Sequence, residues 1–331
     1  MTFEDRAVAA PPELRFTEHV IEDGASLALM LPASESRTGI YWLDFADGYS
    51  YVGQSVAVRS RLATHRRRWA DAVRVKFAPC AAEDLDRLEV AAIRHAESLR
   101  VNLRNKLLTG RPGGGQDTIV EVREGVSLAL PWDRARRGGL EIGTLPTPTE
   151  AEQARFARLQ QRTGWEHLAA ATSVLIREAV PAPTLSQRAL WTVSALPSTG
   201  QTEGSHRMLT LSAGRLEILR VHEVTGGAAV ERWAWLNLTE EREPEANRIL
   251  ERIIALGYDP NEAVTFPDYG SIADVAAVGV ELRDLPALVR EQTVLDAVYR
   301  LVVTAMRQGS APLGRHHNQA LANELLLRAS R

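Results

Sequence analysis

The residues whose types and spacing suit the hydrolysis of a phosphate ester lie between positions 41 and 89. Tyr41 and Tyr51 flank a strong turn signal, and a hairpin turning there would bring both hydroxyls close together. Arg61 and His65 are four residues apart and would share one face of a helix. That face would present a guanidinium for bidentate phosphate binding and an imidazole that takes or gives a proton.

Two further polar positions complete the set. Glu89 lies one turn after Leu85 and next to Leu88, at the edge of an apolar helical stripe. A carboxylate is avoided there unless it is paired or bound to a cation. Asn102 follows the end of that helix, and Asn105 is the alternative for the same place. Taken singly, each of these residues also fits an ordinary role, such as a half-buried strand tyrosine, a surface Arg–His pair or a helix cap.

The elements that must position these side chains follow from hydrophobic periodicity and turn signals. Asp47-Gly48 predicts a tight turn between two strands, and a Gly-rich segment at 110–115 predicts a domain boundary. The predicted strands are 40–45, 49–52 and 73–78, and residues 26–31 could form one more. The predicted helices are 56–69, with Val58, Leu62 and His65 or Trp69 on its apolar stripe, and 82–99.

The charge of this region differs from that of the whole chain. The 331 residues carry a net charge of −3, whereas residues 53–111 hold 13 Lys or Arg against 6 Asp or Glu, a local net charge of +7. The densest point is Arg66-Arg67-Arg68. A local basic patch matters more for binding a polyanion than the overall balance does, although a solvated helix face is the ordinary alternative.

Composition indicates a globular protein of the cytoplasm. A single cysteine, Cys80, excludes an internal disulfide framework and a cysteine-rich zinc site. Charged residues precede any apolar run at the N-terminus, so no signal peptide is expected. No apolar stretch approaches the ~20 residues that span a bilayer, so no membrane partner is expected.

The motifs occur in the order of a known set: Gly39-Ile40-Tyr41, Tyr51-Val52-Gly53, Arg61 with His65, then Glu89 and an asparagine. Residues 38–111 resemble the GIY-YIG endonuclease superfamily, in which ten-residue steps between these landmarks are ordinary. The resemblance covers about a quarter of the chain. It implies an α+β fold with a small antiparallel three-stranded sheet flanked by helices.

The resemblance also implies the chemistry. Glu89 would hold one divalent cation, Mg²⁺ or Mn²⁺, which neutralises the scissile phosphate and stabilises the leaving oxygen. Tyr41 would lie near the attacking water as its general base. Because a free phenol has a pKa of ~10, that role needs a metal or cationic group nearby. Arg61 would bind the phosphate oxygens as negative charge builds up in the transition state.

The remaining positions would support this centre. His65 would relay the proton or position the water, and Tyr51 would orient the phosphate or the water. Asn102, or Asn105 in its place, would support the site by hydrogen bonding. The side chains expected to contact nucleic acid are those of Gln54, Arg59, Arg66, Arg67, Arg68, Lys76 and Arg104.

Two departures from the family's pattern narrow the choice of branch within the superfamily. Gln54 occupies a position where repair-type members often have lysine, and the chain lacks the cysteine-rich RING-like module of the eukaryotic structure-specific members. The resemblance therefore favours a bacterial or phage-related nuclease, of the restriction, defence or mobile-element kind.

Residues 116–331 carry no recognised motif. We expect an N-terminal extension at 1–36, the nuclease domain at 37–111, a linker and helical region at 112–180, and a mixed α+β domain at 181–331 for targeting, dimerisation or regulation. Trp191, Trp233 and Trp235 are expected in the core or an interface rather than as base-stacking platforms. The elements expected are a strand pair within 119–130, a hairpin within 208–222, a strand at 230–238 and helices at 150–162, 165–179, 244–256, 284–307 and 318–329.

Two functions remain open on the sequence. The first is a metal-dependent endonuclease that hydrolyses DNA, with RNA a weaker possibility. It would act as a possible homodimer, since one small site nicks one strand and double-strand cleavage needs two. The second is a nucleic-acid-binding, sensor or interaction protein in which the nuclease module is silent or regulated.

Overall fold

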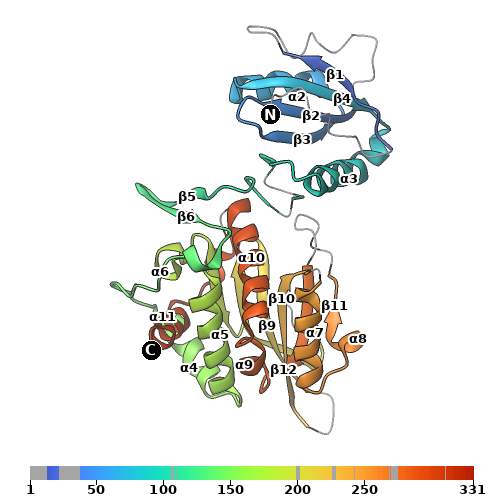
Figure 1. Cartoon of the computed structure of the whole chain (residues 1–331). Coiled ribbons are helices and arrows are strands. Elements are labelled where there is room, and N and C mark those ends of the chain that lie inside the picture. The colour runs from blue at the N-terminus through green and yellow to red at the C-terminus, as the bar shows by residue number, and fades with distance from the viewer. Residues whose placement is uncertain are drawn as a thin grey trace. The chain divides into compact units, whose positions relative to one another are not determined.

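The computed structural model of the chain describes residues 13–21, 38–105, 108–109, 111–198, 202–225, 229–241, 243–267, 269, 275–309 and 311–331. They form two compact units, which are Met1–Gly115 and Gln116–Arg331 (Figure 1). The boundary falls at the end of the glycine-rich segment that the sequence singles out. A linker and helical region was expected at 112–180, and its residues from 116 onward share a unit with those of the expected C-terminal domain.

The sheet of unit 1 is antiparallel and has four strands in the order β1-β4-β2-β3. Three were predicted, so the predicted strand number was wrong. The additional strand lies outside the resemblance and is mostly exposed, and it is held to β4 by pairing and by ion pairs of Glu18 with Arg74 and Lys76. The predicted strand at 26–31 lies outside the described residues. The strands are β1 (Thr17–Val20), β2 (Gly39–Phe45), β3 (Ser50–Ser55) and β4 (Ala72–Pro79).

The predicted hairpin of β2 and β3 is confirmed. Gly48 has a left-handed φ of 83°, and the Gly48 N–H donates to the Phe45 carbonyl at 3.0 Å. The Asp47 carboxylate accepts a hydrogen bond from the Tyr49 N–H at 3.0 Å and so stabilises the turn.

Two helices cover the two faces of this sheet: α2 (Val58–Arg68) and α3 (Leu85–Ser98), the latter preceded by a 3-10 turn at Ala82–Asp84. Alternate residues of β2 therefore enter different cores. Tyr41 and Leu43 pack with Val58 and Leu62 of α2, whereas Ile40 and Trp42 pack on the side of α3. This central strand is buried on both faces and fixes both helices relative to each other.

Unit 2 is built on a six-stranded antiparallel sheet in the order β11-β12-β10-β9-β8-β7. Helices α5, α7 and α10 lie on the same face of that sheet (Figure 1). The strands are β7 (Trp191–Ala195), β8 (Ser205–Ala213), β9 (Leu216–Val224), β10 (Glu231–Thr239), β11 (Val264–Thr265) and β12 (Val275–Glu281). The main helices are α4 (Glu150–Gln160), α5 (Trp165–Ala179), α7 (Glu245–Ala255), α10 (Gln292–Gln308) and α11 (Gln319–Ala329).

Most elements predicted for this unit are present, including the 208–222 hairpin and a separate hairpin of β5 (Thr118–Arg123) and β6 (Val126–Leu130). The single helix predicted over 284–307 was wrong, since the chain forms the short α9 (Leu285–Leu288) and then begins α10 at Gln292. Strands β7 and β12 were not predicted. Along the described residues, no helix is long and apolar enough to cross a membrane.

Candidate active site

Strand register places the two tyrosines of the motifs side by side. Tyr41 on β2 pairs with Gly53 on β3, and Leu43 pairs with Tyr51. A Cβ atom at Gly53 would lie 2.5 Å from the Tyr41 hydroxyl oxygen and 2.9 Å from a ring carbon of Tyr51. The glycine of the second tripeptide is therefore needed so that the Tyr41 hydroxyl can lie against the backbone of β3.

Gly39, the glycine of the first tripeptide, also lies where a side chain would not fit. A Cβ atom at Gly39 would collide with the carbonyl oxygen of Ala78 and would lie 2.7 Å from a ring carbon of Phe77. Both residues are on β4, which pairs with β2. Gly39 thus permits the close approach of the two central strands that carry the site.

Helix α2 brings an imidazole onto this pair of rings. The Nε2 atom of His65 is 2.8 Å from the hydroxyl oxygen of Tyr41, within hydrogen-bond distance. The His65 ring centroid lies 5.2 Å from that of Tyr51 and 4.7 Å from that of Trp69, whose plane is within 5° of parallel. Three aromatic rings therefore hold the imidazole in a fixed orientation toward the Tyr41 hydroxyl.

Arg61, one turn earlier on α2, connects this aromatic group to solvent. Its guanidinium is exposed and interacts with the hydroxyls of Tyr41 and Tyr51. The pKa of Arg61 is raised, first by its hydrogen bond to Tyr41. Burial raises the pKa of Tyr41 well above its ordinary value, and Tyr51 adds to that rise while Arg61 opposes it. The Tyr41 phenol is therefore neutral at physiological pH.

Glu89 lies on the other flanking helix, α3, and is half-buried. Burial raises the pKa of its carboxyl group, whereas a hydrogen bond from Gln54 and the positive charge of Arg61 act in the opposite direction. Gln54 also donates from Nε2 to the carboxylate of Asp86, one turn before Glu89. Arg61 is thus an electrostatic neighbour of both the tyrosine pair and this carboxylate.

The two asparagines occupy different environments. Asn102 has an exposed side chain and contributes its backbone carbonyl, which accepts from the Ser50 N–H at 2.9 Å. Asn105 is buried, and its side chain accepts from the Val52 N–H at 3.0 Å and donates to the Val52 carbonyl at 2.7 Å. Asn105 therefore fixes β3 beside Tyr51, and of the two alternatives it is the one whose side chain supports the site.

Two of the side chains expected to contact nucleic acid are engaged within the fold. Lys76 is 3% exposed and pairs with Asp44 at 3.3 Å above the ring of Trp42. Arg104 lies over the ring of Phe45 and pairs with Asp47 at 2.6 Å and with Asp71. Lys76 is therefore buried, and two carboxylates and an aromatic ring hold Arg104.

The remaining basic residues lie along α2. Arg59 is half-buried in the first turn of the helix. The backbone of Arg66, Arg67 and Arg68 is helical, and their side chains lie outside the described part of the structure.

The fit of the site to a divalent cation follows from its donor groups. No group of three or more His, Cys, Asp or Glu side chains that could hold a metal ion occurs among the described residues. Mg²⁺ often keeps several waters and binds one or two carboxylates together with substrate phosphates, so it does not need such a group. The half-buried Glu89, with Asp86 one turn away, fits that requirement, since a cation would offset the burial that raises the pKa of Glu89.

Two residues of this site were missed from the sequence. Trp69, four residues after His65, stacks on the imidazole, and Asp86, three residues before Glu89, shares Gln54 with it. Both have helical spacing to a motif residue, which is the signal that would have found them.

A cavity of about 520 Å³ lies elsewhere, in unit 2, and is lined by Trp132, Tyr299 and several charged side chains. Each of its three arginines has a carboxylate partner. Arg134 pairs with Asp296 at 2.6 Å, and Arg137 pairs with Glu178 at 2.7 Å. Arg300 pairs with Glu241 at 2.6 Å. The positive charges of these arginines are balanced by their carboxylate partners, and none of the motif residues lines the cavity.

Comparison of the chain with protein-family models, with curated proteins and with solved structures gave no match. The assignment of a function therefore rests on the residues and on their geometry.

Proposed function

We propose that the chain is a metal-dependent endonuclease that hydrolyses phosphodiester bonds in DNA, with unit 1 as the catalytic module. The observation that carries this proposal is the position of Arg61. Its guanidinium interacts with the hydroxyls of Tyr41 and Tyr51 and is also an electrostatic neighbour of Glu89. Arg61 is an exposed cation that interacts with Tyr41, the proposed proton acceptor, and with Glu89, the proposed metal-binding carboxylate. It is therefore suited to bind a substrate phosphate.

Arg61 and Tyr51 are the groups that first meet the substrate, because Arg61 is exposed and Tyr51 half-buried. The guanidinium would bind two oxygens of the scissile phosphate and stabilise the charge that develops there. Tyr41 has no exposed surface in this structure. When Arg61 turns toward the phosphate it leaves the Tyr41 hydroxyl, which then becomes accessible to the attacking water.

Tyr41 and His65 would take the proton of that water together. A phenol whose pKa is raised cannot act as a base in its ionised form at neutral pH. Its oxygen can accept a proton from the water while its own proton passes to His65 Nε2, 2.8 Å away. A neutral imidazole has one ring nitrogen that accepts a proton, which suits this role.

Glu89, with Asp86 beside it, is the group that would hold Mg²⁺ or Mn²⁺. The bound cation would supply neutralisation of the scissile phosphate and of the leaving oxygen. Gln54 orients both carboxylates, since it hydrogen-bonds to each of them. The catalytic residues are thus held by β2, β3, α2 and α3, all packed into the two cores of unit 1.

The proposal is tested by cleavage of supercoiled plasmid, linear duplex, single strand, branched DNA and RNA in the presence of Mg²⁺ or Mn²⁺. Wild type is compared with Glu89→Gln and with Glu83→Gln, a control at an exposed carboxylate just before α3. We expect cleavage that is lost at least about a hundredfold in Glu89→Gln and kept in Glu83→Gln. Nicking of the plasmid would indicate an independent site, and direct linearisation would indicate a dimer.

No cleavage of any substrate by wild type would overturn the proposal. The burial of Tyr41 would then support the alternative of a silent or regulated module. Equal loss in both variants would show that the carboxylates act through folding rather than through a cation.

A further inference from the structure

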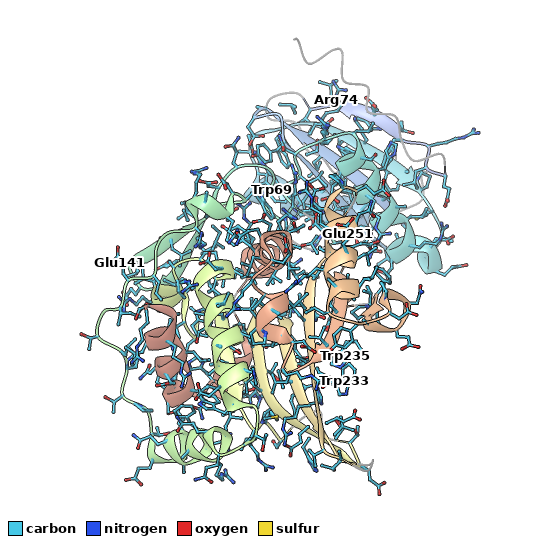
Figure 2. The ribbon with its side chains drawn as sticks, turned by 60° about the horizontal axis from the view of Figure 1, so that its bottom comes forward. Trp69, Arg74, Glu141, Trp233, Trp235 and Glu251 are labelled. Atoms are coloured by element: carbon cyan, nitrogen blue, oxygen red, sulfur yellow. The ribbon has the colours of Figure 1, made fainter. Side chains whose placement is uncertain are left out.

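Trp69 ends α2, and its indole lies in the proposed site although it belongs to none of the motifs. It directly follows Arg68, the last residue of the helix, and its N–H donates to the His65 carbonyl at 2.7 Å. The side chain is half-buried (Figure 2). Its ring plane is within 5° of that of His65, with 4.7 Å between the ring centroids. The face of the indole therefore lies against the face of the imidazole.

Neighbouring rings fix the direction of that indole. Its ring centroid is 4.9 Å from that of Tyr51 on β3. It is 5.3 Å from that of Phe45 on β2, at an interplanar angle of 77°. Phe45 is fully buried in the core on the α2 side of the sheet, and Trp69 packs against that core. Turning the indole away from the imidazole would break these contacts.

A positive charge on His65 would arise close to other titratable and charged groups. The Nε2 atom of His65 is 2.8 Å from the Tyr41 hydroxyl oxygen, and the ring of Tyr51 contacts the imidazole. Arg61 lies one turn earlier on the same helix and interacts with both tyrosine hydroxyls. The arginines at 66–68 follow, with side chains outside the described part of the structure. Because like charges repel, Arg61 disfavours a proton on His65, so the site needs a group that stabilises the imidazolium.

Two features of the structure provide that stabilisation. His65 is in the last turn of α2, and the C-terminal end of a helix favours positive charge. The face of an aromatic ring attracts cations within about 6 Å of its centroid, and tryptophan attracts them most strongly. Because the indole of Trp69 is parallel to the imidazole, it presents this face to the whole ring that would carry the charge.

We propose that Trp69 is a positioning residue of the endonuclease site and stabilises the imidazolium that forms when His65 takes a proton. This inference rests on the proposed function. In that reaction the attacking water gives a proton to the Tyr41 oxygen, and the Tyr41 proton passes to Nε2 of His65. The oxygen of the water bonds to phosphorus as the bond between phosphorus and the leaving oxygen breaks. The leaving oxygen takes a proton from solvent, and the imidazolium afterwards gives its proton to solvent.

Packing alone is the alternative role for this indole. A half-buried aromatic side chain stabilises the fold whatever the charge of the ring that it contacts. Removing the indole would then lower the stability of unit 1 and leave the proton affinity of His65 unchanged. The proposed role requires that His65 also bind its proton more weakly. The pKa of His65 therefore separates the two roles.

The inference is tested on the full chain by NMR titration of the histidine ring protons, with EDTA present and without nucleic acid. His65→Gln identifies the His65 signal among those of the eight histidines. Trp69→Leu and Trp69→Phe are compared with wild type. Phe45→Leu is the matched control, since it removes a ring from the same core and keeps the indole.

We expect Trp69→Leu to lower the pKa of His65 by about half to one pH unit. Trp69→Phe should lower it less, because a benzene face attracts a cation more weakly than an indole face does. Phe45→Leu should leave it as in wild type. If Trp69→Leu does not fold, the comparison of Trp69→Phe with wild type decides. An equal His65 pKa in wild type and the Trp69 variants, or an equal decrease in Phe45→Leu, would overturn the inference.

Cleavage provides a second readout. His65 accepts a proton only when it is neutral, so its pKa would limit kcat at low pH. In Trp69→Leu the acidic side of the kcat profile should move to lower pH by the same amount as the pKa measured by NMR. A profile that stays in place while the measured pKa moves would overturn the positioning role.

The two proposals fail in different measurements. The NMR titration needs neither a metal nor DNA. A wild-type protein that cleaves no substrate would overturn the endonuclease proposal, whereas an unchanged His65 pKa in a wild-type protein that does cleave would overturn only the role of Trp69.

Discussion

Both units place aromatic side chains on antiparallel sheets, and they do so with opposite burial. In unit 1 the strand that carries Tyr41 is covered on both faces, and the Tyr41 hydroxyl is enclosed by His65, Tyr51 and Arg61. In unit 2 Trp235 lies on a face away from the helices, is half-buried and lies against Gly279 of the next strand. Enclosure changes the proton affinity of a phenol, whereas a half-buried ring keeps contact with solvent.

The charged groups follow the same division. Arg61 is exposed, and the groups with which it interacts are the hydroxyls of Tyr41 and Tyr51 and, electrostatically, Glu89. Arg207 and Arg220 are less exposed and both pair with Glu217, at 2.5 Å and 3.6 Å. The first arrangement suits a group that must move onto a reacting phosphate. The second suits side chains that hold neighbouring strands together.

The largest expected effect concerns the exposed cation of the unit 1 site. Arg61→Ala should lower cleavage about 10²- to 10³-fold, since a donor aimed at developing charge is lost. Arg74→Ala, which removes a half-buried partner of Glu18, is the control and should change cleavage little. Single-turnover rates measure both variants, and equal losses in the two would contradict the role proposed for Arg61.

A pair of glycine substitutions sharpens the comparison of burial. Gly53→Ala puts a methyl group 2.5 Å from the enclosed Tyr41 hydroxyl, so we expect it to destabilise unit 1 by about 1 to 3 kcal/mol. Gly279→Ala meets the ring of Trp235, which can lift from the sheet, so its cost should be below about 1 kcal/mol. Urea unfolding measures both changes.

The same pair has a functional readout. Gly279→Ala should leave cleavage intact, whereas Gly53→Ala should lower it, because of the two glycines only Gly53 lies against the Tyr41 hydroxyl. Equal destabilisation by the two substitutions would show that Trp235 is as firmly enclosed as Tyr41, which would contradict the contrast between the two sheets.

The sequence predicted the hairpin and both helices of unit 1 because their signals are local: a turn pair and helical spacing. It did not predict strand β1, whose four residues are mostly exposed and gain their partner from β4, more than fifty positions away. The cross-strand neighbours on the unit 2 sheet, such as Arg220 beside Trp235, were also missed. They exist only once the register of β8, β9 and β10 is known, and alternation alone does not say which face the helices cover.

The two asparagines give a smaller effect and resolve an alternative that the sequence left open. Asn105→Ala should cost about 1 to 3 kcal/mol, because the Val52 N–H and carbonyl lose their buried partner. Asn102→Ala should change stability by less than about 0.5 kcal/mol, since its side chain is exposed. Thermal unfolding of both variants measures this, and a larger loss in Asn102→Ala would reverse the assignment.

The smallest effect concerns the charge of Glu89. Its folded-state pKa is raised, chiefly by burial, so the folded protein holds this proton more tightly than the unfolded chain does. The resulting stability is fully present below the unfolded pKa of ~4.3 and is lost as the pH rises through the folded pKa. Glu89→Gln stays neutral, so it should unfold at a higher temperature than wild type at pH 7.5, and this difference should shrink at pH 4.

Added Mg²⁺ tests the cause of that difference. A cation that binds Glu89 stabilises only the protein that keeps the carboxylate, by an amount that grows with its concentration above the dissociation constant. Differential scanning fluorimetry should therefore show Mg²⁺ raising the midpoint of wild type and not that of Glu89→Gln. EDTA should restore the gap. A midpoint that rises equally in both proteins would place the cation elsewhere and leave the raised pKa of Glu89 as a consequence of burial alone.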